Sequence, residues 1–138
     1  MLISVAERMP VGLLDTSVII DIEKVNPSQL PKSGAISSIT MAELSAAPAA
    51  TVDPEERAHR QGRLQRAEAA FDPIPFDIAA ARAYGLVASA VLTRGRKPRS
   101  RVADLLIAAT AVAEDLPLYT RNANDLAGLE ALVTVVEV

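Results

Sequence analysis

Short apolar runs of strand length alternate along the chain with longer segments of helical character. The apolar runs cover residues 11–14, 35–39, 117–120 and 132–138. A strand that is apolar along its whole length is typical of a parallel sheet, because helices cover both faces of such a sheet. Strands that alternate with helices therefore predict an α/β fold with a parallel sheet and helices on both faces.

Helix signals occupy the segments between these runs. We expect helices over residues 17–24, 40–47, 54–71, 78–92 and 104–113. Asp53 and Pro54 are a typical start for the third of these helices, and Asp77 is expected to cap the fourth. The fifth is apolar on every face, which is typical of a helix buried at the centre of a domain.

The length of 138 residues fits a single domain, which we place at residues 11–138. Residues 1–10 show no clear periodicity and are expected to form a flexible extension. The core must be aliphatic, because the chain has no Trp and only two Tyr and two Phe. No apolar stretch approaches the roughly 18 residues of a membrane span, and residues 1–10 lack the apolar core of a signal peptide. We expect a cytoplasmic protein with no membrane partner.

Two classes of chemistry are excluded by composition. The chain has no cysteine, so it has neither disulfides, nor thiolate zinc sites, nor a cysteine nucleophile. It has one histidine, His59, which excludes a histidine-rich metal site and disfavours a Ser-His-Asp triad. The remaining candidates for chemistry are carboxylates and hydroxyls.

Four acids stand in apolar or junctional positions, where an unpaired carboxylate is costly. They are Asp15, Glu43, Asp104 and Asp125. Each also has a structural explanation. Asp15 or Thr16 would cap the helix that follows the first strand, and Glu43 matches the last position of a capping box. Asp104 would be an N-cap, and Asp125 would form an Asx turn.

Taken together, the four positions favour a common site. Every strand-to-helix junction of a parallel sheet lies at the same edge, so these acids could meet in space. Clustered carboxylates raise one another's pKa unless a cation neutralises them. Oxygen ligands without His or Cys suit Mg²⁺ or Mn²⁺. Such sites activate water for the displacement at phosphorus that nucleases and phosphatases perform.

Basic residues form two groups on a chain whose net charge is −3. The first group contains Arg94, Arg96, Lys97, Arg99 and Arg101, and Gly95 and Pro98 lie among these residues. The other recurs every third residue, at Arg57, Arg60, Arg63 and Arg66. The first group predicts a loop that contacts phosphates. The second is interpreted as an ordinary solvated helix face.

Four segments carry a family resemblance. In order, they are LLDTSVII at 13–20, TMAEL at 40–44, DLLIAATA at 104–111 and TRNxxDL at 120–126. Together they resemble the signature of the PIN-domain family, and more specifically that of VapC-type toxins of bacterial toxin–antitoxin pairs. The resemblance covers nearly the whole chain from Val11 onward. No single segment is specific, but the four in this order and spacing are.

The resemblance implies a single PIN-like domain with a three-layer α/β/α fold. It also implies a Mg²⁺- or Mn²⁺-dependent endoribonuclease with an RNA substrate. Its expected partners are a second copy, forming a homodimer, and a cognate VapB-type antitoxin whose C-terminal segment covers the active site. The toxin and antitoxin are then expected to form a heterotetramer or a larger assembly.

Site residues follow from the same resemblance. Asp15, Glu43 and Asp104 match the family's three best-defined acids, and Asp125 is our choice for the fourth, in preference to Asn122. Asp15 and Asp104 are expected to hold the principal metal ion. The expected substrate or supporting contacts are Thr16, Ser17, Thr120, Arg121 and Asn122. For Arg121, a surface charge without a role is an equal alternative.

Three other functions compete with this one. A haloacid-dehalogenase phosphatase needs a second Asp two residues after the first, where this chain has Ser17. A dinucleotide-binding module needs a glycine-rich turn after the first strand, which the six scattered glycines do not form. The strongest alternative is a PIN scaffold that binds RNA or protein with little or no catalysis.

Overall fold

A computed structural model describes residues 8–138, with a four-stranded parallel sheet at its centre. The strands, in chain order, are β1 (Val11–Leu14), β2 (Ser33–Ala35), β3 (Leu118–Thr120) and β4 (Val135–Glu137). In space the order is β2-β1-β3-β4, and every neighbouring pair is parallel. After β1 the chain forms β2 on one side of this strand, and it then returns to form β3 and β4 on the other side of β1. Ligands of such sheets bind at the carboxyl ends of the strands on either side of this reversal, here β1 and β3.

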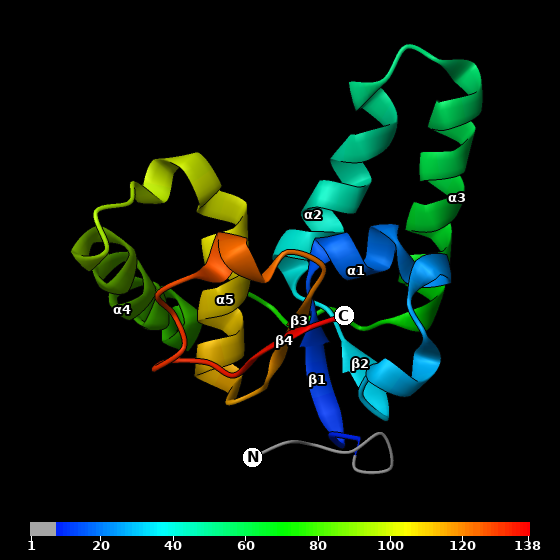
Figure 1. Cartoon of the computed structure of the whole chain (residues 1–138). Helices are drawn as coiled ribbons and strands as arrows, with labels where there is room; N and C mark the ends of the chain where they lie inside the picture. Colours follow the sequence, from blue (N-terminus) through cyan, green and yellow to red (C-terminus); the bar gives the residue numbers. More distant parts are fainter. Residues whose placement is uncertain (1–7) are drawn as a thin grey trace.

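Helices cover both sides of the sheet, as the alternating pattern predicts (Figure 1). The α-helices are α1 (Thr16–Ile20), α2 (Ser38–Ala46), α3 (Pro54–Ala70), α4 (Ile78–Thr93) and α5 (Val102–Glu114). Figure 1 shows α4 and α5 on one side, and α2 and α3 extending beyond the sheet on the other. Short 3₁₀ turns complete the connections: η1 (Ile22–Lys24), η2 (Pro27–Gln29), η3 (Ala47–Ala50), η4 (Pro98–Arg101) and η5 (Ala123–Leu126).

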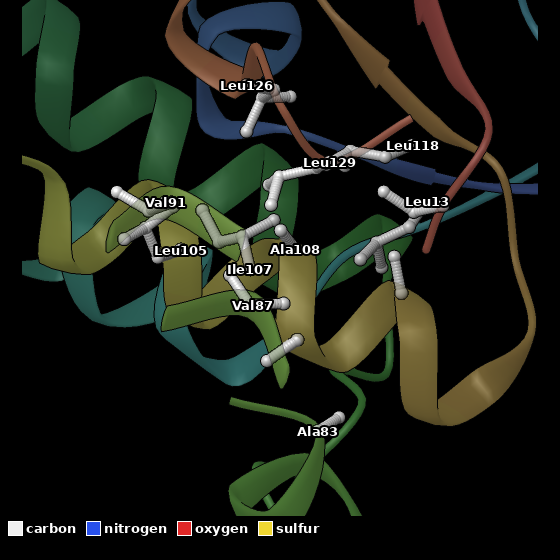
Figure 2. Packing of buried hydrophobic residues seen from close by; sticks show 13 residues of the cluster. Leu13, Ala83, Val87, Val91, Leu105, Ile107, Ala108, Leu118, Leu126 and Leu129 are labelled. Carbon is white, nitrogen blue, oxygen red and sulfur yellow. The ribbon is translucent and has the colours of Figure 1, made fainter. Parts of the chain in front are cut away.

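The core has two parts because β1 is apolar toward both faces. Successive residues of a strand point to opposite faces, and Leu13 and Leu14 are both buried. Leu13 belongs to the cluster between the sheet, α4 and α5, where Ile107 and Leu118 are also fully buried (Figure 2). Leu14 belongs to the cluster on the other face, with Val18. The prediction that α5 is a central buried helix is confirmed.

Two predicted helix starts are confirmed by their caps. The Asp53 carboxylate accepts a hydrogen bond from the Glu55 N–H at 3.2 Å at the start of α3. The Asp77 carboxylate accepts one from the Ala80 N–H at 2.9 Å at the start of α4. Each bond satisfies one of the backbone donors that a helix start leaves without an intrahelical partner.

The boundary between β2 and α2 was predicted wrongly. The strand ends at Ala35, four residues before its expected end, and the helix begins at Ser38, two residues before its expected start. Ser37 caps α2 by accepting a hydrogen bond from the Thr40 N–H at 3.1 Å. Thr40 is thus inside the helix, and Glu43 lies in its second turn. The capping-box explanation of Glu43 is therefore wrong.

Other predictions at the chain ends and the surface have mixed outcomes. Residues 1–7 of the expected extension lie outside the described residues, whereas Met9 and Pro10 accept hydrogen bonds from the Lys32 and Ser33 N–H groups.

The arginine row on α3 is more than a solvated face, because Arg60 donates to the Ala47 carbonyl at 2.9 Å and ties α3 to the preceding turn. Among the helices of residues 8–138, none is both long and apolar enough to cross a membrane.

Candidate active site

Asp15 lies at the carboxyl end of β1 and is buried, 9% exposed. Its N–H donates to the Tyr119 carbonyl on β3 at 2.9 Å, and its own carbonyl accepts from the Val18 N–H at 3.0 Å. Asp15 is therefore the N-cap of α1 by position, but its side chain makes no capping hydrogen bond. The backbone starts the helix while the carboxylate remains available for other contacts.

Two hydroxyl groups hold the Asp15 carboxylate. Ser17 Oγ donates to Asp15 Oδ2 at 2.6 Å, and Thr120 Oγ1 donates to the same oxygen at 3.1 Å. The hydroxyls are in turn fixed by the chain that follows β3. The Arg121 N–H donates to Ser17 Oγ, and the Asn122 N–H donates to Thr120 Oγ1, both at 3.1 Å. The ends of β1 and β3 thus form one hydrogen-bonded unit around the carboxylate.

Thr16 brings the second acid to the same place. Its Oγ1 donates to Glu43 Oε1 on α2 at 2.6 Å and lies 3.0 Å from Thr40 Oγ1. Thr40 is fully buried, so this contact is anchored in the core. The residue that directly follows Asp15 therefore orients Glu43.

Asp104 is the third residue of α5, whose N-cap is Arg101, so the explanation of Asp104 as an N-cap is wrong. The pKa of Asp104 is raised from 3.8 to about 6. Burial is the largest cause, and the charges of Asp15, Asp125 and Glu43 raise the pKa further, while Arg101 lowers it. The structure therefore brings together the four acids that the sequence singled out.

Asp125 pairs with an arginine that the sequence had placed in a phosphate-binding loop. Arg101 Nη1 lies 2.7 Å from Asp125 Oδ1 and 3.9 Å from Asp104 Oδ2. The Asp125 side chain is thus engaged in an ion pair, in place of the expected Asx turn. Sequence reasoning missed this role for Arg101. The three-residue spacing of Arg101 and Asp104 indicates only the contact between these two side chains; the pair with Asp125 has no signal in the sequence.

Arg121 and Asn122 contribute to the site mainly through their backbone. The Arg121 side chain lies 3.4 Å from Asp21 Oδ2 and donates to the Val138 carbonyl at 2.9 Å. It therefore ties the end of α1 to the end of the chain. The Asn122 side chain is exposed, and the Asn122 backbone carbonyl accepts from the Asp125 N–H at 3.1 Å.

With this geometry in view, comparison with known proteins decides the family. The sequence pattern of the PIN domain matches residues 12–129, which span β1 to the turn after η5. The chain belongs to the PIN-domain family. The predictions of family and α/β fold are confirmed.

Named relatives of this PIN domain come from Mycobacterium tuberculosis. Ribonuclease VapC5 is 33% identical over 127 residues, covering 90% of this chain and 91% of the relative. Ribonuclease VapC4 is 34% identical over 121 residues, covering 86% and 90%. Among solved structures, a VapBC-5 toxin–antitoxin complex from the same organism superposes with a TM-score of 0.83 at 30% identity, covering 94% of this chain and 99% of the other.

The acids of this PIN domain fit a hard divalent cation by their chemistry. Carboxylate and hydroxyl oxygens are the donors that Mg²⁺ and Mn²⁺ prefer, and each of three acids opposes ionisation of the fourth. Within residues 8–138, however, no three Asp, Glu or His side chains are already placed as ligands of a metal ion. Asp125 is paired with Arg101, whereas Thr16 engages one oxygen of Glu43. Asp15, Glu43, Asp104 and Asp125 are the residues that would hold the metal.

Proposed function

We propose that this PIN domain is a metal-dependent endoribonuclease and the toxin of a toxin–antitoxin pair. The observation that carries the proposal is the gathering of four acids at the edge of the sheet, where burial first and then the charges of the other three raise the pKa of Asp104 to about 6. Such shifts cluster at functional sites, because few structural needs gather like charges. The names of the relatives, both ribonucleases, support the choice of RNA as substrate.

In this proposal Asp15 and Asp104 hold the principal Mg²⁺ or Mn²⁺, Glu43 completes the site or positions a water molecule, and Asp125 supports a second ion or its water. The chemistry that such an ion supplies when bound is neutralisation of charge and activation of water for in-line attack on a phosphate. Cleavage of this kind leaves a 5′-phosphate and a 3′-hydroxyl.

The chain's own residues prepare the site for this reaction. Ser17 and Thr120 fix one oxygen of Asp15, so the carboxylate cannot rotate freely. Thr16 fixes Glu43 in the same way. Supporting contacts of this type orient metal ligands and are typically worth about 10–100-fold in affinity or activity. Arg101 provides positive charge beside the acids, where an RNA phosphate would approach.

Partners are proposed on the same grounds. VapBC complexes and FitAcB from Neisseria gonorrhoeae, which has a TM-score of 0.69 at 26% identity, have the same fold. We propose a cognate VapB-type antitoxin and a homodimer of the chain, assembled with the antitoxin as a heterotetramer or a larger complex.

A binding module without catalysis is the second candidate, and the ion pair of Arg101 favours it. An internal cation that stably neutralises Asp125 and faces Asp104 would stand in for a metal ion. The acids would then serve only to hold the fold together or to contact a partner.

The two candidates are separated by cleavage of a structured RNA by the purified protein. We expect cleavage in Mg²⁺ or Mn²⁺ and none in chelator. Asp15→Asn and Asp104→Asn should each reduce the rate by more than the roughly 10–100-fold that supporting residues cost. Asp72→Asn, which removes an exposed acid after α3, is the matched control and should cleave as the wild type does. Cleavage in chelator, or full activity of both site variants, would contradict the proposed function.

A further inference from the structure

A cavity of about 580 Å³ lies beside the acids, on the side of α4 and α5. Four parts of the chain line it: the end of α4, the basic loop that includes η4, the start of α5, and η5 with the residue after it. Figure 1 shows these parts gathered around the upper end of α5. Its volume falls within the roughly 300–1,000 Å³ that is usual for sites of small ligands.

The lining of the cavity has an apolar part and a basic part. Val91, Leu105 and Ala127 form the apolar part. Val91 and Leu105 belong to the buried core cluster, so this part is rigid (Figure 2). The basic part consists of Arg96, Lys97 and Arg101. A ligand that suits both parts combines a flat, weakly polar body with a negative charge.

Two arginines of the lining are held in place by η5. Arg96 Nη1 donates to the Asn124 carbonyl at 3.0 Å, and Arg101 Nη1 lies 2.7 Å from Asp125 Oδ1. Both Asn124 and Asp125 also line the cavity. The basic wall is therefore tethered to the opposite wall, and long side chains that would otherwise lose entropy on binding are partly ordered beforehand.

Asp125 connects the cavity to the acidic site. It lines the cavity, and the arginine that it binds also reaches Asp104 at 3.9 Å. A ligand in the cavity would thus lie next to a phosphodiester placed at the acids. Because the cavity and the acids share Arg101 and Asp125, neighbouring units of one RNA chain would occupy both, which favours part of the RNA itself over a separate small anion.

We propose that this cavity binds one unpaired nucleotide of the RNA, next to the phosphodiester that is cleaved; the inference rests on the proposed function for its substrate. The base lies against Val91, Leu105 and Ala127 and against the guanidinium planes, which stack on bases in RNA-binding proteins. The phosphate is bound by the basic wall. Because a paired base cannot enter a cavity, the inference predicts a preference for single-stranded or looped RNA.

The test is the binding of a short fluorescent RNA, measured by anisotropy in chelator so that no cleavage occurs. Ala127→Leu fills the cavity without changing charge, and Ala81→Leu adds the same volume on the exposed face of α4. Arg96→Gln removes a charge from the cavity, and Arg82→Gln removes one from α4. The single-stranded RNA and a duplex of the same sequence are compared for each variant, and circular dichroism checks that each is folded.

We expect both cavity variants to bind the single-stranded RNA at least about fivefold more weakly, which is the lower end of the effect of losing one stacked base. The two α4 variants should bind as the wild type does, and all proteins should bind the duplex alike. Equal binding by Arg96→Gln and Arg82→Gln, or equal losses for duplex and single strand, would overturn the inference even if Ala127→Leu failed to fold. Cleavage in Mn²⁺ is scored separately, so a protein that binds selectively but does not cleave would contradict the proposed function and support the cavity.

Discussion

At the scale of single residues, Asp15 and Asp104 have different surroundings. Asp15 is buried but receives two hydroxyl hydrogen bonds on one oxygen. Asp104 is half-buried, and burial first and then three neighbouring acids oppose its ionisation. The sequence could indicate both positions, because an acid in an apolar segment needs an explanation. The sequence could not indicate how strongly each carboxylate is held by its neighbours, because this depends on distances between segments far apart in the chain.

The raised pKa of Asp104 predicts a pH dependence of stability in chelator. The folded protein holds a proton on Asp104 up to a pH of about 6, whereas the unfolded chain loses it near 3.8. The contribution of Asp104 therefore makes the folded state more stable as the pH falls from about 6 toward 4, and less stable at higher pH. Urea unfolding at several pH values should show this trend in the difference between wild type and Asp104→Asn. Parallel pH profiles for the two proteins would contradict the assignment.

Thr16 is predicted to act through Glu43. Thr16→Val keeps the shape of the side chain but removes the hydroxyl that donates to Glu43 Oε1. We expect RNA cleavage to fall by about 10-fold or more, as for other residues that orient ligands, and more Mn²⁺ to be needed for half-maximal rate. Thr93→Val removes an exposed hydroxyl that donates to the Ser89 carbonyl on α4 and is the control. An unchanged Mn²⁺ requirement in Thr16→Val would contradict this role.

At the scale of elements, the predictions were most accurate for the segments that are apolar on every face. β1 has the bounds expected for it, and the middle of α5 is buried at residues 105 and 107–111. The prediction of the boundary between β2 and α2 was wrong because Ile36 continues the apolar run after the strand has ended. Ile36 is fully buried for packing on the second core cluster, and the apolar run alone does not distinguish this from a strand. The Ser37 cap sets the start of the helix.

Ser37 is therefore predicted to stabilise α2 and, through it, the position of Glu43. Ser37→Ala removes the hydroxyl that accepts from the Thr40 N–H. Loss of such a cap costs about 0.5–2 kcal/mol of unfolding free energy. Urea denaturation measures the loss, and Ser89→Ala, an exposed change on α4, should be close to neutral. A Ser37→Ala protein as stable as Ser89→Ala would show that the cap does not determine the helix start.

At the scale of the whole molecule, parallel topology explains why the four acids meet. Asp15 and Asp125 follow adjacent strands β1 and β3, while Glu43 and Asp104 lie on α2 and α5, two helices that contact each other. This convergence could be predicted from sequence, because strand-end junctions share an edge. The ion pair between Arg101 and Asp125 could not, since it depends on how the η4 turn directs one long side chain.

The proposed function requires these acids to bind a divalent metal ion. A crystal structure of the protein soaked in Mn²⁺, with the ion located by its anomalous scattering, shows directly whether they do. We expect a peak between the carboxylates of Asp15 and Asp104, with Glu43 or Asp125 turned toward it and the Arg101 pair loosened. Carboxylates that remain apart, with Arg101 still bound to Asp125 and no anomalous peak among the acids, would contradict it.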